Sequence, residues 1–342
     1  MEIGVYATTH GLAYRDSENV LARSLGPELL VPVETAQLAE DMGFHSMWFP
    51  DHVCMPMASD SEHVANTSGS RAYESRHTMF DAAVTMGAVA QATKSLKLGT
   101  SVLICPYRHP LSDARQFATV DQLSSGRLLF GVGAGWLAEE FAAIGIPYDE
   151  RGVRTDECIE VYKQCWTKET VSYRGRFYNF ESLSMDPKPI QNPHPPIIYG
   201  GVTPAGSRRA AKLCDGFYPI FLDPFARADR YRNEQQCIRR ELDAIERPHD
   251  EFIMIGVSSA RIVSAEDPLC REDPRRICTG TSDQIIHDLE TFAKEGYSLV
   301  VCFLDCPSGE MRELHEQMHL FGESVIPKAK AIQPKGGWRQ DF

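Results

Sequence analysis

The chain has 342 residues, of which 43% are hydrophobic and 24% are charged, and its formal net charge is −12 at pH 7. This composition is typical of a soluble globular protein. The acidic balance argues against a broad surface for nucleic acid or for an anionic membrane, and no window resembles an apolar membrane span. We therefore expect neither nucleic acid nor a membrane among the partners.

Ten cysteines are scattered along the chain without a Cys-x-x-Cys pair, and residues 2–7 begin directly as a strand without a basic leader. Both features favour reduced thiols and a cytoplasmic location. Because α/β barrels of this length often form one domain, we expect a single domain at 1–330 and a tail at 331–342. The polar, glycine-containing end at 334–342 is expected to be mobile.

Apolar runs and helical patterns alternate from the first residue onward. The strands are predicted at residues 2–7, 46–50, 96–104, 127–132, 196–199, 216–220, 252–258 and 298–304. The helices are predicted at residues 33–42, 79–92, 111–123, 136–144 and 152–166, from 204, and at 224–245, 282–295 and 309–325. Three stretches break the rhythm: an irregular segment at 8–27, a loop at 54–77, and an aromatic hairpin with a proline-rich crossing at 171–191.

Eight strands that alternate with helices predict a parallel sheet. Eight is the number that closes a (β/α)8 TIM barrel, here with insertions after several strands, and a doubly wound open sheet is the alternative. In a barrel the active site lies at the carboxyl ends of the strands. The unusual residues of this chain fall at those ends.

The run Gly126-Arg-Leu-Leu-Phe-Gly-Val-Gly-Ala-Gly-Trp136 is a buried strand that leads into a glycine-rich turn. Glycines so placed allow a large flat group to approach the backbone, although a tight turn alone also explains them. A second strand ends at Gly200 and Gly201, and a helix then begins with Thr203 as its cap and Pro204 at its first position. Such a helix start suits a phosphate, with Ser207, Arg208 and Arg209 as further donors; a capped helix with solvated arginines is the alternative.

Several polar or aromatic side chains follow the strands and are candidates for chemistry. Asp51 and His52 come directly after the second strand, and an imidazole there can exchange a proton with a bound ring or a substrate. Tyr107 and Arg108 follow the third strand as candidate substrate contacts, and Trp136 is a candidate platform for a flat ligand. Structural roles for these side chains remain the alternative.

One motif indicates a different function. His315-Glu316-Gln-Met-His319 fits the H-E-x-x-H pattern of zinc peptidases, with both histidines on one face of a helix. That helix belongs to the outer wall of a barrel. A zinc-dependent hydrolase through His315 and His319 is therefore the alternative function, and otherwise we expect no metal.

Taken together, several segments resemble the luciferase-like flavin-dependent oxidoreductases, TIM-barrel enzymes that use reduced FMN or the deazaflavin F420. The segments that carry the resemblance lie at residues 39–52, 97–103, 116–136, 140–141, 150–157, 187–189, 200–201 and 215–216. The overall pattern is most similar to the F420-type branch. Two departures bear on the substrate and the cofactor. Trp136 stands where F420-dependent sugar-phosphate dehydrogenases carry a glutamate, and Ala134 stands where bacterial luciferase has an arginine for the FMN phosphate.

The resemblance implies a role for each candidate residue. His52 would be the acid or base, Asp51 would contact the cofactor ring, and Ser101-Val102 would be a non-prolyl cis peptide that backs the ring. The other implied cofactor contacts are Ala134, Gly135 and Glu139 beside the ring, and Gly200, Gly201, Ala205 and Gly206 at the phosphate. Substrate contacts would be Trp136, Tyr107 and Arg108, under the covering segments 54–77 and 171–191.

The implied activity is redox chemistry on a small organic substrate. It would proceed by hydride transfer with F420 or by activation of O2 with FMNH2, in the latter case with a separate flavin reductase. Family members commonly form homodimers. A binding barrel without enzymatic activity is a further alternative.

Overall fold

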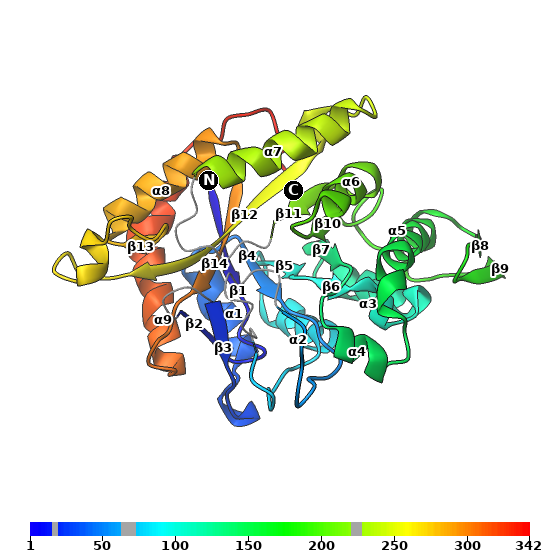
Figure 1. Ribbon diagram of the computed structural model, residues 1–342, viewed down its shortest axis with the longest axis horizontal. Coiled ribbons are helices and arrows are strands. Elements are labelled where there is room, and N and C mark those ends of the chain that lie inside the picture. The colour runs from blue at the N-terminus through cyan, green and yellow to red at the C-terminus, as the bar shows by residue number, and fades with distance from the viewer. Residues whose placement is uncertain (16–19, 63–72, 220–227) are drawn as a thin grey trace.

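A computed structural model describes residues 1–15, 20–62, 73–219 and 228–342 (Figure 1). Within these residues, eight parallel strands form the central wall. They are β1 (Glu2–Tyr6), β4 (Ser46–Phe49), β5 (Lys97–Thr100), β7 (Leu128–Gly133), β10 (Ile197–Gly200), β11 (Gly216–Tyr218), β12 (Ile253–Ile262) and β14 (Leu299–Leu304). All eight of the predicted strands are therefore present.

The wall closes on itself. β1 pairs with β14 on one side and with β4 on the other, and the register aligns Gly4 with Val301 and with Ser46. β10 joins β7 to β11, which completes the circle. The fold is thus the (β/α)8 barrel, and the doubly wound open sheet is excluded.

Helices surround the wall (Figure 1). The α-helices of the described chain are α1 (Pro32–Asp41), α2 (Ala82–Ala92), α3 (Pro110–Leu123), α4 (Ala138–Ala143), α5 (Arg151–Thr167), α6 (Pro204–Leu213), α7 (Ala228–Asp243), α8 (Ser282–Lys294), α9 (Met311–Leu320) and α10 (Ile326–Ala329). A π-helical turn (Phe321–Val325) joins the last two. Short 3-10 turns lie at Pro27–Leu29, Cys105–Tyr107, Tyr148–Glu150, His249–Glu251 and Pro268–Arg271. No helix among these described residues is both long and apolar enough to cross a membrane.

Local sequence explains where helices begin and end. Pro32, Pro110 and Pro204 stand in the first turn of their helices, where the missing N–H costs no hydrogen bond. Gly43 follows α1 with a φ of +81°, as a left-handed C-terminal cap requires. α8 begins with a capping box between Thr281 and Gln284. These caps set the helix ends and thereby the short connections to the following strands.

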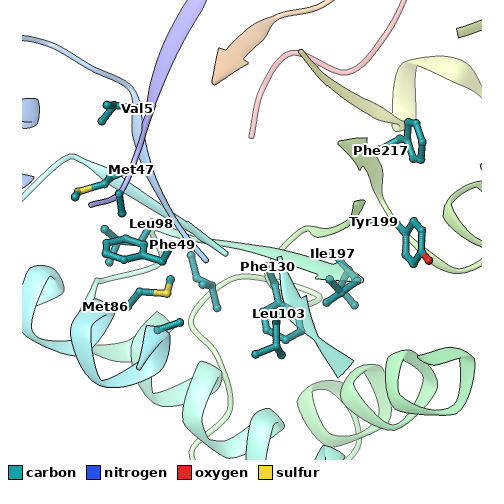
Figure 2. Close-up of a cluster of buried hydrophobic side chains, with 14 of the residues drawn as sticks. Val5, Met47, Phe49, Met86, Leu98, Leu103, Phe130, Ile197, Tyr199 and Phe217 are labelled. Carbon is teal, nitrogen blue, oxygen red and sulfur yellow. The ribbon is translucent and has the colours of Figure 1, made fainter. Parts of the chain in front are cut away.

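Apolar side chains fill both faces of the wall. Figure 2 shows part of this packing, where Phe49 and Leu98 of the strands lie near Met86 of α2, and Phe130 lies near Leu103 and Ile197. Inside the barrel, the Trp48 and Tyr218 rings stack with centroids 5.1 Å apart. A Cβ on Gly99 would lie 2.4 Å from the Trp48 ring, so this strand position requires glycine. The interior is thus a packed core.

Several small strands lie outside the main wall. The predicted irregular segment 8–27 contains an antiparallel hairpin, β2 (Leu12–Arg15) with β3 (Val20–Arg23), so that prediction was wrong. β6 (Leu103–Ile104) pairs with β7 beyond the end of β5, and β13 (Thr279–Gly280) pairs with the end of β12. The predicted loop 54–77 and the predicted start of a helix at 224 lie partly outside the described residues.

The predicted hairpin at 171–191 is present as β8 (Val171–Arg174) and β9 (Asn179–Leu183). The Glu157 carboxylate of α5 accepts the backbone N–H groups of Arg176, Phe177 and Tyr178 at 2.7, 3.0 and 3.3 Å. The hairpin therefore packs on α5 at the edge of the molecule (Figure 1). None of the residues 171–191 lines the cavity described below, so its role as a substrate cover stays a prediction.

Part of the tail that the sequence predicts to be mobile packs against the fold. Trp338 is 3% exposed, and Arg239 of α7 lies 4.0 Å above its ring centroid. The Phe342 ring lies edge-on to His45, and the Lys97 ammonium donates to the Phe342 carbonyl group. His45 and Lys97 precede or begin strands, so the tail closes the amino-terminal end of the barrel.

Candidate active site

A cavity of about 310 Å³ opens beside the carboxyl ends of β7 and β10. Strand residues and the starts of α5 and α6 line it together. Six residues that the sequence assigned to the cofactor line it: Val102, Ala134, Gly135, Gly200, Gly201 and Ala205. Four others do not: Asp51, Ser101, Glu139 and Gly206. Of the predicted substrate contacts, Trp136 lines the cavity, and Tyr107 and Arg108 do not.

The peptide bond between Ser101 and Val102 is cis, as the resemblance implied. Ser101 Oγ lies 3.0 Å from the Tyr218 hydroxyl, which ties this turn to the barrel core. A Cβ on Gly133 would lie 2.6 Å from Val102 Cγ2, and one on Gly200 would lie 2.5 Å from Val102 Cγ1. These two glycines therefore make room for the Val102 side chain, which in turn forms a wall of the cavity.

Not every glycine of the first run serves a ligand. A Cβ on Gly131 would lie 1.8 Å from the Thr100 carbonyl oxygen, so this glycine permits close packing of β7 on β5. Gly135 has a φ of +82° and turns the chain away from the strand. Residues 133–135 of this run line the cavity, whereas Gly131 does not line it and serves strand packing instead.

The start of α6 forms one end of the cavity. Thr203 caps the helix, because its hydroxyl accepts the Gly206 N–H at 3.1 Å. Gly206 is therefore already satisfied, and Ser207 is buried with its hydroxyl directed at the Thr203 carbonyl. Arg208 is exposed and does not line the cavity. Of the three donors predicted after Thr203, only Arg209 reaches the cavity.

Two arginines line the cavity at this end. Arg209 forms an ion pair with Asp156 and donates to the Tyr199 hydroxyl at 3.2 Å and to the Gly152 carbonyl at 3.0 Å. Burial opposes the charge on Arg209, but the Asp156 partner outweighs it and raises the pKa of this guanidinium. Arg151 lies 3.8 Å above the Tyr148 ring. We did not single out Arg151 from the sequence, although it lies in the segment 150–157 that carried the resemblance.

A buried carboxylate holds the candidate acid or base. His52 Nδ1 lies 2.7 Å from Glu140 Oε2, and the Glu140 side chain is fully buried. The same carboxylate accepts the Tyr107 hydroxyl at 2.7 Å and the backbone N–H groups of Val53 and Cys54 at 2.6 and 3.1 Å. Burial alone would raise the pKa of Glu140, but the hydrogen bonds from His52 and Tyr107 outweigh it, and the pKa is lowered. Glu140 is thus the residue beside His52 that the sequence prediction omitted.

Asp51 and Arg108 bind each other. The guanidinium donates to both carboxylate oxygens at 2.7 and 2.6 Å, and Asp51 Oδ2 also accepts the Ile104 N–H at 3.1 Å. Ile104 lines the cavity. The pair therefore supports the cavity wall from behind, and neither partner reaches the cavity as the sequence had suggested.

The neighbouring carboxylate, Glu139, holds a loop. It accepts the Asp60 N–H at 2.7 Å and the Ser61 hydroxyl at 2.8 Å. Burial opposes these hydrogen bonds, which together outweigh it and lower the pKa of Glu139 to about 2. Trp136, three residues earlier, lines the cavity and lies edge-on to His52 with centroids 6.3 Å apart. Trp136 therefore connects the cavity to the His52 side of the site.

The H-E-x-x-H motif does not form a metal site in the described chain. His315 Nε2 lies 3.2 Å from the Thr35 hydroxyl of α1. Among the residues described, no group of three or more His, Cys, Asp or Glu side chains could hold a metal ion. His315 thus helps to dock α9 on α1, and nothing supports the zinc hydrolase.

Comparisons with known proteins identify the family and the fold. Residues 1–299 match the family described as luciferase-like monooxygenase. An uncharacterized protein of Mycobacterium tuberculosis is 31% identical over 189 residues, which are 55% of this chain and 67% of that protein. The FMNH2-dependent dimethylsulfone monooxygenase of Pseudomonas putida is 39% identical over 134 residues, 38% of this chain and 37% of that protein. A solved F420-dependent secondary alcohol dehydrogenase, in complex with an F420-acetone adduct, has the same fold. It superposes with a TM-score of 0.68 at 19% identity and covers 96% of this chain and 98% of that chain.

Proposed function

This chain belongs to the luciferase-like monooxygenase family of oxidoreductases, and from that premise we propose that it uses reduced FMN to oxygenate a small organic molecule. The observation that carries the proposal is the cavity between the cis turn at Val102 and the start of α6, with the His52–Glu140 pair beside it. The FMNH2-dependent relative, 39% identical over 134 residues, supports the choice of cofactor. When bound, reduced FMN supplies the electrons that activate O2.

The lining of the cavity suits a flat ring that carries a phosphate. Val102, Ile104 and the backbone of Gly133 offer an apolar wall for a ring. Ala205 lies in the first turn of α6, where a helix amino terminus favours an anion. Arg151 and Arg209, the latter paired with Asp156, add guanidinium donors to the lining. We propose that these residues hold the FMN phosphate.

The proposed proton chemistry belongs to His52. Because Glu140 accepts a hydrogen bond from Nδ1, the ring is held in the tautomer that carries hydrogen on Nδ1. Nε2 of the neutral ring is then free to accept a proton. The Glu140 carboxylate stabilises the imidazolium that results, as an ionised partner does in other acid–base sites. In this proposal Asp51, Tyr107 and Arg108 position His52, Glu140 and Ile104 without touching the ligand.

F420-dependent hydride transfer is the second candidate. The cavity continues past the helix start to Asp149, Arg151 and Gly152, and F420 differs from FMN in bearing an anionic tail beyond its phosphate. The similarity to the F420-dependent alcohol dehydrogenase supports this candidate at the level of the fold. An enzyme that uses F420 would need neither O2 nor a separate flavin reductase.

Equilibrium titration of the apo protein with FMN, FMNH2 and both redox states of F420 tests the proposal. We expect FMNH2 to bind, and riboflavin, which lacks the phosphate, to bind at least about tenfold more weakly. Arg209→Gln should weaken FMN binding by about tenfold, whereas Arg208→Gln, an exposed neighbour on the same helix, should leave the affinity unchanged. Binding of F420 alone would select the second candidate, and binding of neither would refute both.

Three finer points are also proposals. The FMN route requires a separate flavin reductase, and we propose a homodimer in the cytoplasm. Light scattering of the purified protein tests the dimer. Dependence of turnover on an added reductase tests the partner, because a photochemical supply of FMNH2 should replace it.

A further inference from the structure

Two histidines near His52 have buried ring nitrogens without a hydrogen-bond partner among the described residues. His10 follows β1, is 3% exposed, and has an unpartnered Nδ1; His77 has an unpartnered Nε2. A buried polar atom that makes no hydrogen bond costs about 1–3 kcal/mol. Such an atom usually forms its hydrogen bond with a bound ligand or an ordered water.

The two rings belong to one cluster with His52. The Tyr73 ring lies edge-on to His10, His52 and His77, with centroids 5.5, 5.2 and 5.2 Å away. Tyr6 of β1 lies edge-on to His10 and stacks on Phe303 at the end of β14. The cluster therefore joins the segments that follow β1 and β4 to the end of β14, at the carboxyl end of the barrel.

This cluster is separate from the cavity proposed for the cofactor. His10, Tyr73 and His77 do not line that cavity. Tyr73 contacts His52, whose ring in turn lies edge-on to Trp136 of the cavity wall. A molecule held by His10 and His77 would thus be next to the proton-handling residue.

The hydrogen-bonding capacity of His77 follows from its other nitrogen. His77 Nδ1 accepts the backbone N–H of Glu74 at 3.3 Å, so the hydrogen of the neutral ring resides on Nε2. The backbone of His10 lies close to this ring and favours its protonated form. In the described chain, Nε2 of His77 is a buried donor that has no hydrogen-bond partner.

The charge of this cluster disfavours an anion. Burial, then His77 and His52, holds the pKa of His10 well below its ordinary value, and burial lowers the pKa of His77 to about 4. Both rings are neutral at pH 7. The buried Glu140 carboxylate lies close enough to act on Tyr73. An anionic group here would meet neutral rings and a neighbouring negative charge.

We propose that His10 and His77 form a substrate subsite that selects uncharged small molecules through an oxygen acceptor, such as a carbonyl or sulfone oxygen. The subsite rests on the proposed function, because it places that substrate beside His52 and next to the cofactor cavity. It assigns specificity to residues that follow β1 and β4 rather than to the α6 end of the cavity.

Nuclear magnetic resonance of the histidine rings tests the proposal with two matched pairs of probes. Acetone and acetate have similar size and differ in charge, as do dimethyl sulfone and methanesulfonate. In the wild-type protein, with its eleven histidines isotope-labelled, acetone and dimethyl sulfone should shift the His10 and His77 signals saturably at pH 7.5. Their anionic counterparts should not do so at equal concentration and ionic strength. Equal or larger shifts with the anions, or no shift with any probe, would overturn the proposal.

Variants assign the signals and separate the subsite from the cofactor site. His10→Phe should weaken acetone binding by about tenfold or more, whereas His10→Gln, which keeps a side-chain hydrogen-bond donor, should bind acetone nearly as wild type does. His287→Gln, on the exposed face of α8, is the control and should change nothing. FMN affinity should be unchanged in all three, so that a failure of the subsite is distinguished from a failure of cofactor binding. A His10→Phe variant that binds acetone normally would refute the subsite.

Discussion

The two ends of the barrel are built in different ways. At the amino-terminal end the chain closes on itself: Trp338 is buried against α7, and Phe342 packs beside His45 and Lys97. At the carboxyl end the wall opens into a cavity. Buried charged groups there hold individual side chains in place, as Glu140 holds His52. The contrast implies that stability is concentrated at one end and chemistry at the other, as in other barrels of this type. If so, matched changes at the two ends should have different consequences.

Two tryptophans offer the strongest test of this division. Trp338→Ala removes a buried ring and its hydrogen bond to Gln235 at 3.3 Å, and should lower the free energy of unfolding by about 3–5 kcal/mol. FMN affinity should stay within about twofold at temperatures where the variant is folded. Trp136→Ala, at the cavity, should weaken FMN binding and leave the free energy of unfolding nearly unchanged. Urea denaturation measures the stability of both variants, and flavin titration measures their FMN affinity. A Trp338→Ala protein that loses cofactor affinity at unchanged stability would contradict the division between the two ends.

The second prediction concerns the buried carboxylate. Glu140→Gln keeps the shape but cannot accept all four of its present hydrogen bonds, so His52 loses its fixed tautomer. Turnover should fall by about 10²-fold or more, while FMN affinity stays near the wild-type value. His52 ring-nitrogen shifts should change from one tautomer to a mixture, which a merely structural loss would not produce. Tyr107→Phe removes one donor to Glu140 and should cost only a few-fold; equal losses in both variants would argue against this role.

The barrel could be predicted from the sequence because alternating strands and helices leave a local signature in every segment. The packing of the tail could not be predicted, because its residues are mostly polar and the contact of Trp338 with α7 joins segments distant in sequence. Glu139 and Glu140 are adjacent, and the sequence placed both in the first turn of a helix that begins at Trp136. α4 begins at Ala138 instead. Consecutive residues of a helix point in different directions, so Glu140 faces His52 and Glu139 faces the loop at Asp60. The partner of each carboxylate depends on residues distant in sequence, and so does the ion pair between Arg108 and Asp51.

The third prediction tests the glycine contacts behind the cavity. A Cβ on Gly200 would overlap Val102, so Gly200→Ala should push Val102 toward the cavity and weaken FMN binding by about tenfold. Val102→Ala in the same protein should restore part of the affinity, a coupling that a double-mutant cycle measures. The control is Gly87→Ala in α2, where the nearest atom is Leu123 Cδ1 at 4.0 Å. This variant should be stabilised by about 0.4–1 kcal/mol with unchanged affinity. Independent effects of the Gly200 and Val102 substitutions would contradict the packing argument.

The smallest expected effect compares two carboxylates that hold loops at opposite ends. Glu40 accepts the backbone N–H groups of Lys94, Ser95 and Leu96 before β5, and Glu139 holds Asp60 and Ser61 beyond β7. In each, hydrogen bonds outweigh a burial effect of opposite sign and lower the pKa to about 2, against an ordinary value of 4.5. A lowered carboxyl pKa stabilises the structure that the carboxylate holds at pH values above about 4.5, and this contribution is lost as the pH falls toward 2.

The melting temperature of Glu40→Gln should therefore lie below that of the wild type at pH 7, and the difference should shrink as the pH falls from about 4.5 toward 2. Glu139→Gln should show little change in melting temperature at any pH, because it releases only a loop at the open end. Its effect should instead be faster proteolysis within residues 54–62, with FMN as a protecting ligand. A Glu139→Gln protein that melts as early as Glu40→Gln would mean that the loop at the open end also carries global stability. The division between the two ends would then hold for the cavity and His52 but not for the loops around them.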